Sequence, residues 1–205
     1  FAPQLILPIY TFSCINLPDT PTARFLTDQK LRVSCCLMNK FFAVNSISGL
    51  APLEVHQLYK LRVDVFVHEQ QSPYQEIDDI DAFDSTFQVL AWQQDDHGDR
   101  QLIACTRLYP EIAPDGTERF HLGRVCVAES FRGEGMGTEI MKQTLRLAFE
   151  QNPTPDVYLE AQTPQIGFYE TLGFEVAGAE FDWDGIAHTP MIKHASQFTS
   201  ISEAA

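Results

Sequence analysis

The chain has 205 residues, 44% of them apolar, and a formal net charge of −14 at pH 7. That length allows one domain with a substantial core. So acidic a chain lacks the basic face that non-specific nucleic-acid binding needs. No apolar run approaches the ~20 residues that span a bilayer. We therefore expect neither nucleic acid nor a membrane among its partners.

The first 37 residues differ from the rest of the chain. They hold four prolines and three of the five cysteines, and they show no clear hydrophobic periodicity. Met38 is followed by Asn39 and Lys40 in the manner of a translational start. We expect residues 1–37 to be a poorly ordered extension, from an over-extended gene model or a cloning remnant. A targeting peptide is the alternative, but the segment lacks an Arg-rich amphipathic face.

Residues 38–194 alternate between strand-like and helical patterns and are expected to form one α/β domain, with 195–205 as a C-terminal tail. The remaining cysteines, Cys105 and Cys126, lie in apolar runs and should be small buried hydrophobes. We expect no disulfide framework and a reducing cytoplasm. The predicted elements, in chain order, are a strand at 41–44, a helix from Pro52 to about residue 70, strands at 86–92, 101–109 and 120–127, a helix at 136–149, a strand at 157–161, a helix at 164–172, and strands at 174–181 and 186–192.

A loop at residues 72–84 carries five acidic side chains: Glu76, Asp78, Asp79, Asp81 and Asp84. The spacing fails the EF-hand pattern, because Phe83 falls at a ligand position and no glycine follows. No Cys/His spacing typical of zinc is present either. We therefore expect a solvated loop and no metal site.

A glycine-rich turn between a strand and a helix predicts a phosphate site. Gly133, Gly135 and Gly137 follow the apolar run 122–127 and precede the helix. Such a turn lets main-chain N–H groups converge on an anion at the positive end of the helix dipole. A P-loop would need Lys before Ser or Thr after its last glycine, and a dinucleotide fingerprint would need G-x-G-x-x-G. Neither fits, since Thr138 and Glu139 follow Gly137.

Two motifs together resemble the GCN5-related N-acetyltransferase (GNAT) family. The first is Arg-x-x-Gly-x-Gly at 132–137, similar to that family's acyl-CoA pyrophosphate loop. The second is Phe168-Tyr169-Glu170-Thr171-Leu172-Gly173-Phe174, about thirty residues later. The resemblance implies the acyl-CoA N-acyltransferase fold: a mixed, mostly antiparallel sheet of six to seven strands flanked by about four helices.

Longer phrases resemble bacterial ElaA-type acetyltransferases. They are residues 61–70, 72–78, 160–162 and 184–188, and the similarity covers about 38–193. Two departures are visible: Glu160 stands where a small residue is expected, and Ala187 where proline is expected. Neither touches the glycine turn.

The resemblance implies how the donor, acetyl-CoA, would be held. Main-chain groups near Val125, Cys126 and Val127 would hold the acyl arm and polarise the thioester carbonyl. Gln162 would bond the pantetheine amide, against the alternative of a surface glutamine. Arg132 would add a charged contact to the pyrophosphate, or instead pair with Glu129 or Glu134. The implied donor-binding residues are Val125, Cys126, Val127, Arg132, Gly133, Glu134, Gly135, Met136, Gly137, Thr138, Gln162 and Phe168.

The acceptor side is less defined by the sequence. Tyr169 matches the family's general acid, which would protonate the leaving thiolate, although a packed tyrosine bonded to a carbonyl is the alternative. Glu160 and His188 are candidate bases, with Glu69, His68 and water as alternatives. Arg62, Phe66 and Glu69 share a helix face and could line the acceptor cleft, or only pack the helix with flanking ion pairs.

The function implied is acetyl-CoA-dependent N-acetyl transfer to a primary amine of a small molecule or peptide, by direct attack in a ternary complex. Two alternatives stay open: an acyltransferase similar to acyl-homoserine-lactone synthases, and a non-catalytic CoA-binding regulatory module. Whether the protein forms a homodimer is also open.

Overall fold

The computed structural model describes residues 39–71 and 75–198. The expectations for residues 1–37 and for the end of the tail lie outside these ranges. The strands are β1 (Asn39–Asn45), β2 (Phe87–Gln94), β3 (Arg100–Ile112), β4 (Glu118–Val127), β5 (Asp156–Gln162), β6 (Glu175–Val176), β7 (Phe181–Trp183) and β8 (Ile186–Lys193). The helices are α1 (Pro52–Arg62), the π-helical segment η2 (Val63–Glu69), α2 (Met136–Gln151) and α3 (Ile166–Thr171). Short 3-10 turns complete this part of the chain: η1 (Ile47–Gly49), η3 (Asp79–Ala82), η4 (Glu129–Phe131), η5 (Thr163–Gln165) and η6 (Ala195–Gln197).

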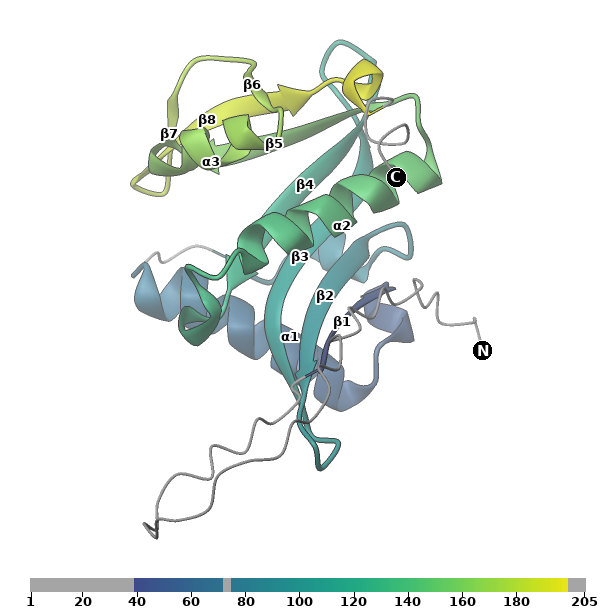
Figure 1. The fold of residues 1–205 in the computed structure, drawn as a ribbon. Coiled ribbons are helices and arrows are strands. Elements are labelled where there is room, and N and C mark those ends of the chain that lie inside the picture. The colour runs from purple at the N-terminus through teal and green to yellow at the C-terminus, as the bar shows by residue number, and fades with distance from the viewer. Residues whose placement is uncertain (1–38, 72–74, 199–205) are drawn as a thin grey trace, which may run out of the picture.

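One eight-stranded sheet runs through the described residues in the order β1-β2-β3-β4-β5-β8-β6, with β7 also paired to β8 (Figure 1). All neighbours are antiparallel except β4 and β5, which are parallel. The predicted fold is therefore confirmed. The sheet of the described residues has eight strands, of which β6 and β7 are short, where six to seven were expected, and there are three α-helices where about four were expected.

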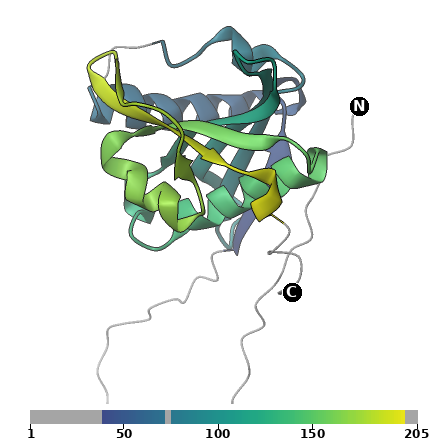
Figure 2. The same cartoon turned by 90° about the horizontal axis from the view of Figure 1, so that it is seen from above.

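The helices lie on both faces of the sheet, as the view from above shows (Figure 2). On one face, Leu58 and Leu61 of α1 and Val65 of η2 pack in one cluster with Leu90 and Trp92 of β2. On the other face, the apolar side of α2 packs its buried residues on the sheet in a second cluster, which α3 also contacts. None of the helices in the described segments is long and apolar enough to cross a bilayer.

Most expected boundaries shift by a few residues, and two of the differences change the architecture. The single strand expected at 174–181 is divided into β6 and β7, because the chain leaves β8 after Ala177 N–H donates to the Pro190 carbonyl. At the C-terminal end, Phe198 is buried in the core that α2 covers. The folded part therefore continues to Phe198, four residues beyond the end expected for the domain.

The parallel pair β4–β5 opens into a splay. The strands pair only from Arg119↔Asp156 to His121↔Tyr158 and then diverge (Figure 1). Just beyond this point β4 has a bulge: Cys126 pairs with Cys105 but Gly123 pairs with Arg107, so β4 carries one extra residue. Arg124, in the bulge, has φ +52°, a left-handed conformation that non-glycine residues rarely adopt. The bulge and the splay together expose main-chain groups in the middle of the sheet.

Candidate active site

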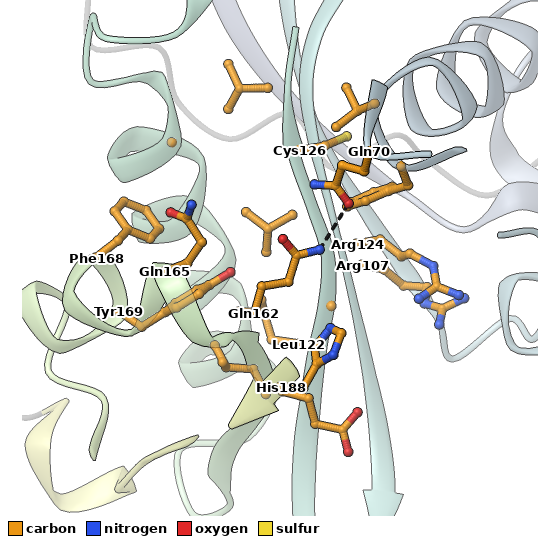
Figure 3. Close-up of a pocket in the computed structure, with 18 of the residues that line it drawn as sticks. Gln70, Arg107, Leu122, Arg124, Cys126, Gln162, Gln165, Phe168, Tyr169 and His188 are labelled. Atoms are coloured by element: carbon orange, nitrogen blue, oxygen red, sulfur yellow. Dashed lines mark hydrogen bonds between the residues drawn. The ribbon is translucent and has the colours of Figure 1, made fainter. Parts of the chain in front are cut away.

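A cleft of about 910 Å³ occupies the splay and passes from the α3 side of the sheet to the α1 side (Figure 3). We call the part beside the glycine turn and α3 the donor end, and the part beside β7, β8 and the acidic loop the acceptor end. Of the residues predicted from sequence, the cleft wall contains Phe66, Glu69, Val125, Cys126, Val127, Arg132, Gly133, Gly135, Met136, Gly137, Thr138, Glu160, Gln162, Phe168, Tyr169 and His188. The structure therefore brings together residues from both ends of the domain.

Among the described residues, no side chain caps the start of α2, which follows the glycine turn. Gly133 and Gly135 have φ of +79° and +85°, which a side chain would strain. The first main-chain bond of α2 runs from Glu139 N–H to the Gly135 carbonyl, and no described side chain caps this end. The N–H groups of residues 136–138 thus lack intrahelical acceptors at the positive end of the helix dipole. This arrangement suits a phosphate group.

Phe168 of α3 packs over the start of α2 at Gly137. A Cβ at this position would lie 3.6 Å from the Phe168 ring, an ordinary van der Waals contact, so the packing does not itself require a glycine. Glu134, in contrast, is exposed near Lys40, 3.9 Å from it, and lies outside the cleft wall.

The edge of β4 presents main-chain groups to the splay. Ala128 N–H donates to the Ile103 carbonyl at 2.8 Å, so in an antiparallel ladder the groups of the preceding residue, Val127, face away from β3. The Val127 carbonyl indeed accepts from Arg132 Nε at 2.9 Å. Its N–H points to the same side, where β5 has already diverged.

Arg132 also forms a bidentate pair with Glu69, at 2.6 and 2.8 Å. Its partner is thus a residue of η2, far along the chain, and not Glu129 or Glu134. The hydrogen bonds from Arg132 lower the pKa of Glu69. Both side chains are more than one-third exposed, so water competes with this contact.

Gln70, the residue that follows η2, makes a second bridge across the mouth of the cleft. Gln162 Nε2 of β5 donates to Gln70 Oε1 at 3.0 Å (Figure 3). The end of η2 is therefore attached both to the glycine turn and to β5. A π-helical turn is uncommon and is often found at functional sites.

Tyr169 projects from α3 toward the cleft (Figure 3). Its ring packs edge-on against Phe168 and Phe174, with centroids 5.1 and 6.0 Å away. No described residue hydrogen-bonds its hydroxyl, which differs from the alternative of a tyrosine bonded to a carbonyl. Burial raises its pKa to about 12, so the phenol stays protonated at neutral pH.

The acceptor end contains the two candidate bases. Tyr158 donates to Glu160 Oε1 at 3.2 Å, and burial followed by the charge of Glu160 raises the pKa of Tyr158 to about 12. His188 Nδ1 lies 2.9 Å from the Ile186 carbonyl oxygen. Because a carbonyl can only accept a hydrogen bond, Nδ1 carries the proton, and Nε2 of the neutral ring has a free lone pair.

Part of the acidic loop is buried, contrary to expectation, although Asp79 and Asp84 are exposed as expected. Glu76 and Asp81 are 4% and 1% exposed, and with Asp78 they alternate with three arginines in a closed ring of ion pairs. Each of Arg62, Arg107 and Arg124 contacts two of the carboxylates, and each carboxylate contacts two arginines. We call this the arginine–carboxylate ring. Burial alone would raise the pKa of Asp81, but Arg62 and then Arg107 outweigh it and lower the pKa.

Arg62 therefore differs in position from Phe66 and Glu69. It is fully buried in the ring, and it is absent from the cleft wall. Its ion pairs explain why a charged residue lies on the packed face of α1. Arg62 therefore does not line the acceptor end of the cleft.

Several residues of the cleft wall were not predicted as site residues from the sequence. They are Gln70, Asp78, Arg107, Tyr109, His121, Arg124 and Trp183. Arg107, Tyr109, His121, Arg124 and Trp183 lie in strands and reach the cleft only through strand register. Gln70 follows η2, and Asp78 lies in the acidic loop. The interruption of β3 and β4 by Arg107 and Arg124 is the one signal that points to them, since buried arginines need acidic partners.

The two cysteines near the cleft are reduced neighbours. Cys105 and Cys126 are buried, with Sγ atoms 3.3 Å apart. The hydrogen bond between them, together with burial, raises the pKa of Cys126. Within residues 39–71 and 75–198, no group of three or more His, Cys, Asp or Glu side chains is arranged to hold a metal ion.

Comparison with known proteins agrees with this geometry. Residues 60–195 match the family model described as acetyltransferase (GNAT) domain. The chain is 35% identical to protein ElaA of Escherichia coli over 150 residues, which covers 73% of this chain and 94% of ElaA. The crystal structure of Escherichia coli ElaA superposes with a TM-score of 0.67 at 32% identity, covering 77% of this chain and 100% of that one.

Two further structures extend the comparison. An acyl-CoA N-acyltransferase from Pseudomonas aeruginosa has a TM-score of 0.67 at 31% identity, covering 76% of this chain and 99% of that one. The CoA-dependent acyl-homoserine lactone synthase BjaI has a TM-score of 0.58 at 16% identity, covering 81% and 87%, and so shares the fold alone. With the family model and ElaA both matching most of the domain, the chain belongs to the GNAT acetyltransferase family.

Proposed function

We propose that this protein transfers an acetyl group from acetyl-CoA to a primary amine, within one ternary complex. The observation that carries the proposal is that an uncapped helix start, suited to a phosphate, and the Tyr169 hydroxyl, which no described residue hydrogen-bonds, open into the same cleft on either side of an exposed strand edge. The family supplies the chemistry of acyl transfer, and the geometry supplies a role for each group.

The donor would lie along the splay. The N–H groups of residues 136–138 would receive the pyrophosphate, with Arg132 moving from Glu69 to add a charged contact. The pantetheine arm would continue beside β4. There it would hydrogen-bond the outward main-chain groups of Val125 and Val127, which have no pairing partner on β5. Gln162, now bonded to Gln70, would turn its amide to the pantetheine.

The reaction moves one proton off the amine and one onto sulfur. The neutral amine nitrogen attacks the thioester carbonyl, whose oxygen gains negative charge that the Val127 N–H stabilises; one such donor is typically worth ~3 kcal/mol. The C–S bond then breaks with its electron pair on sulfur, and Tyr169 donates its proton to the thiolate. The nitrogen loses its proton to Glu160, to His188 Nε2 or to water, and that proton restores the phenol.

Direct transfer is favoured over an acyl-cysteine intermediate. Cys126 is the cysteine in the cleft wall, and it is 4% exposed with its pKa raised by Cys105 and by burial. A thiol that stays protonated and covered is a poor nucleophile.

The test is calorimetric titration of the full chain with acetyl-CoA, followed by an assay of free thiol with a panel of primary amines. We expect micromolar binding and amine-dependent release of CoA. Binding without turnover on any amine would favour the CoA-binding module, and turnover only with acyl carrier protein as donor would favour a reaction similar to lactone synthesis. No detectable binding would refute the proposal.

A further inference from the structure

A buried lysine lies at the C-terminal end of α3, outside the cleft wall. Lys193, the last residue of β8, is 5% exposed, and burial lowers its pKa. Its Nζ donates to the Leu172 carbonyl at 2.9 Å and lies 5.4 Å from the centroid of the Phe198 ring. No carboxylate of residues 39–71 and 75–198 forms an ion pair with it. Burying an ammonium group without a counter-ion costs free energy, so the contacts that it makes call for an explanation.

Lys193 completes the hydrogen bonding at the end of α3. Gly173, left-handed at φ +82°, ends the helix, and the Phe174 N–H turns back to donate to the Tyr169 carbonyl at 3.1 Å, as in a Schellman motif. The Leu172 carbonyl lies beyond the bonds of this motif, and it is the group that Lys193 binds. The ammonium also places positive charge at the negative end of the helix dipole.

Gly173 is fitted to the lysine. A Cβ at this position would lie 2.5 Å from Lys193 Nζ, closer than atoms of two side chains approach, so any side chain there would displace the ammonium. The glycine of the Phe168–Phe174 motif therefore has two physical reasons. It takes a left-handed conformation, and it leaves room for the group that binds the end of the helix.

The position of α3 depends on such contacts at its ends. The helix has six residues, none of them fully buried, and so short a helix is not stable by itself. Lys193 connects its end to β8, which pairs with β5 at Val157, and to Phe198, whose ring stacks on Phe149 of α2 at 6.1 Å. The end of α3 is thereby attached to the strand that borders the splay and to the helix that follows the glycine turn.

From these contacts we infer that Lys193 positions Tyr169 for proton donation. Residues 172–174 hold both parts of Tyr169: its carbonyl accepts from the Leu172 and Phe174 N–H groups, at 3.0 and 3.1 Å, and its ring packs edge-on against the Phe174 ring. When the bond from Lys193 is lost, these residues are free to move and the phenol moves with them. A displacement of about 1 Å is enough to lower a rate by up to 10²-fold. This inference rests on the function proposed above and adds a positioning residue to it.

The first measurement needs no turnover. The full chain is labelled with 3-fluorotyrosine at its six tyrosines, and the fluorine NMR resonance that disappears in Tyr169→Phe is that of Tyr169. Lys193→Met keeps most of the length of the side chain but removes the ammonium, and it should shift or broaden the Tyr169 resonance by more than its linewidth. Thr106→Val is the matched control. It removes a buried hydroxyl that is bonded to Thr144 of α2 at 2.6 Å, and it should leave that resonance in place.

The second measurement is a double-mutant cycle in kcat, with acetyl-CoA and the most active primary amine of the panel. Lys193→Met should lower kcat about tenfold in the parent chain. In Tyr169→Phe it should lower kcat less than about twofold further, because a proton donor that is absent cannot be misplaced. Thr106→Val should lower the urea midpoint but change kcat less than about twofold in both backgrounds. Should Lys193→Met not fold, Lys193→Gln, which keeps a polar side chain at this position, replaces it with the same expected results.

Three outcomes would overturn the inference. One is an unchanged Tyr169 resonance in the lysine variant. Another is an unchanged kcat in the parent chain despite a shifted resonance. The third is a loss of kcat that is equally large in Tyr169→Phe, because such a loss would not pass through the phenol. Absence of turnover with every amine would count against the proposed function alone, and the fluorine resonances would still decide whether Lys193 holds Tyr169 in position.

Discussion

The two ends of the cleft are built in different ways. The donor end is mainly main chain: a short run of glycines, the start of α2 and the outward edge of β4. The acceptor end is side chains, contributed by β3, β4, β5, β7, β8 and the acidic loop. Main-chain groups recognise what every acyl-CoA has in common, whereas side chains can change one at a time. The comparison therefore separates a general donor site from an individual acceptor site, and it predicts different consequences of substitution at each.

The largest effect should come from the arginine–carboxylate ring, which supports the acceptor end. Arg62→Met leaves Glu76 and Asp81 buried without one of their cations, which should cost about 3–5 kcal/mol of unfolding free energy. Lys60→Met removes an exposed pair with Asp64 one turn away and should cost less than about 0.5 kcal/mol. Urea unfolding measures both. Equal losses for the two variants would mean that the ring contributes no more than a surface pair.

The next effect separates chemistry from donor binding. Tyr169→Phe should lower kcat about a hundredfold, because the leaving thiolate loses its proton donor. Acetyl-CoA affinity by calorimetry should stay close to that of the parent, since the ring and its packing against Phe168 and Phe174 remain. With its pKa raised to about 12 by burial, Tyr169 should cause no decline of kcat up to pH 9. An unchanged kcat in Tyr169→Phe would contradict the acid role.

A smaller effect should distinguish the main-chain site from an ordinary turn. Gly135→Ala and Gly116→Ala both force a left-handed alanine, at φ +85° and +87°, with open space around the new Cβ. Each should lose about 1–2 kcal/mol of stability. Only Gly135→Ala, at the start of α2, should also weaken acetyl-CoA binding. Equal donor affinities in the two variants would show that the conformation of the glycine turn is unimportant for the donor.

The same difference explains how far the sequence could predict the site. The glycine turn and the Phe168–Phe174 motif are each a continuous segment of the chain. The residues within each motif are therefore neighbours in space because they are neighbours in the sequence. The order of strands and helices followed from hydrophobic periodicity for a similar reason. Tyr109 stacks on His121 only because β3 and β4 take a particular register, and Trp183 reaches His188 only through the pairing of β7 with β8; no local pattern contains either register.

The acidic loop shows the other limit. A run of carboxylates is normally solvated. The arginines that pair with this one, Arg62, Arg107 and Arg124, are far apart in a stretch of 63 residues. Ion pairs between residues far apart in the chain produce no periodic pattern in the sequence. The left-handed Arg124, which places one of these partners beside the splay, is likewise invisible in composition or spacing.

The smallest effect tests the contact that joins the two ends. Arg132 and Glu69 must separate before Arg132 can reach a phosphate, so Glu69→Gln should tighten acetyl-CoA binding about two- to fivefold, the range of an exposed ion pair. Glu150→Gln removes the similarly exposed partner of Arg146 at the far end of α2 and should leave affinity unchanged. Calorimetry at low salt measures both, and added salt should narrow the difference, because exposed charges are screened. Weaker binding in Glu69→Gln would reverse the interpretation: Glu69 would then hold Arg132 in place for the donor, and the end of η2 would belong to the donor site.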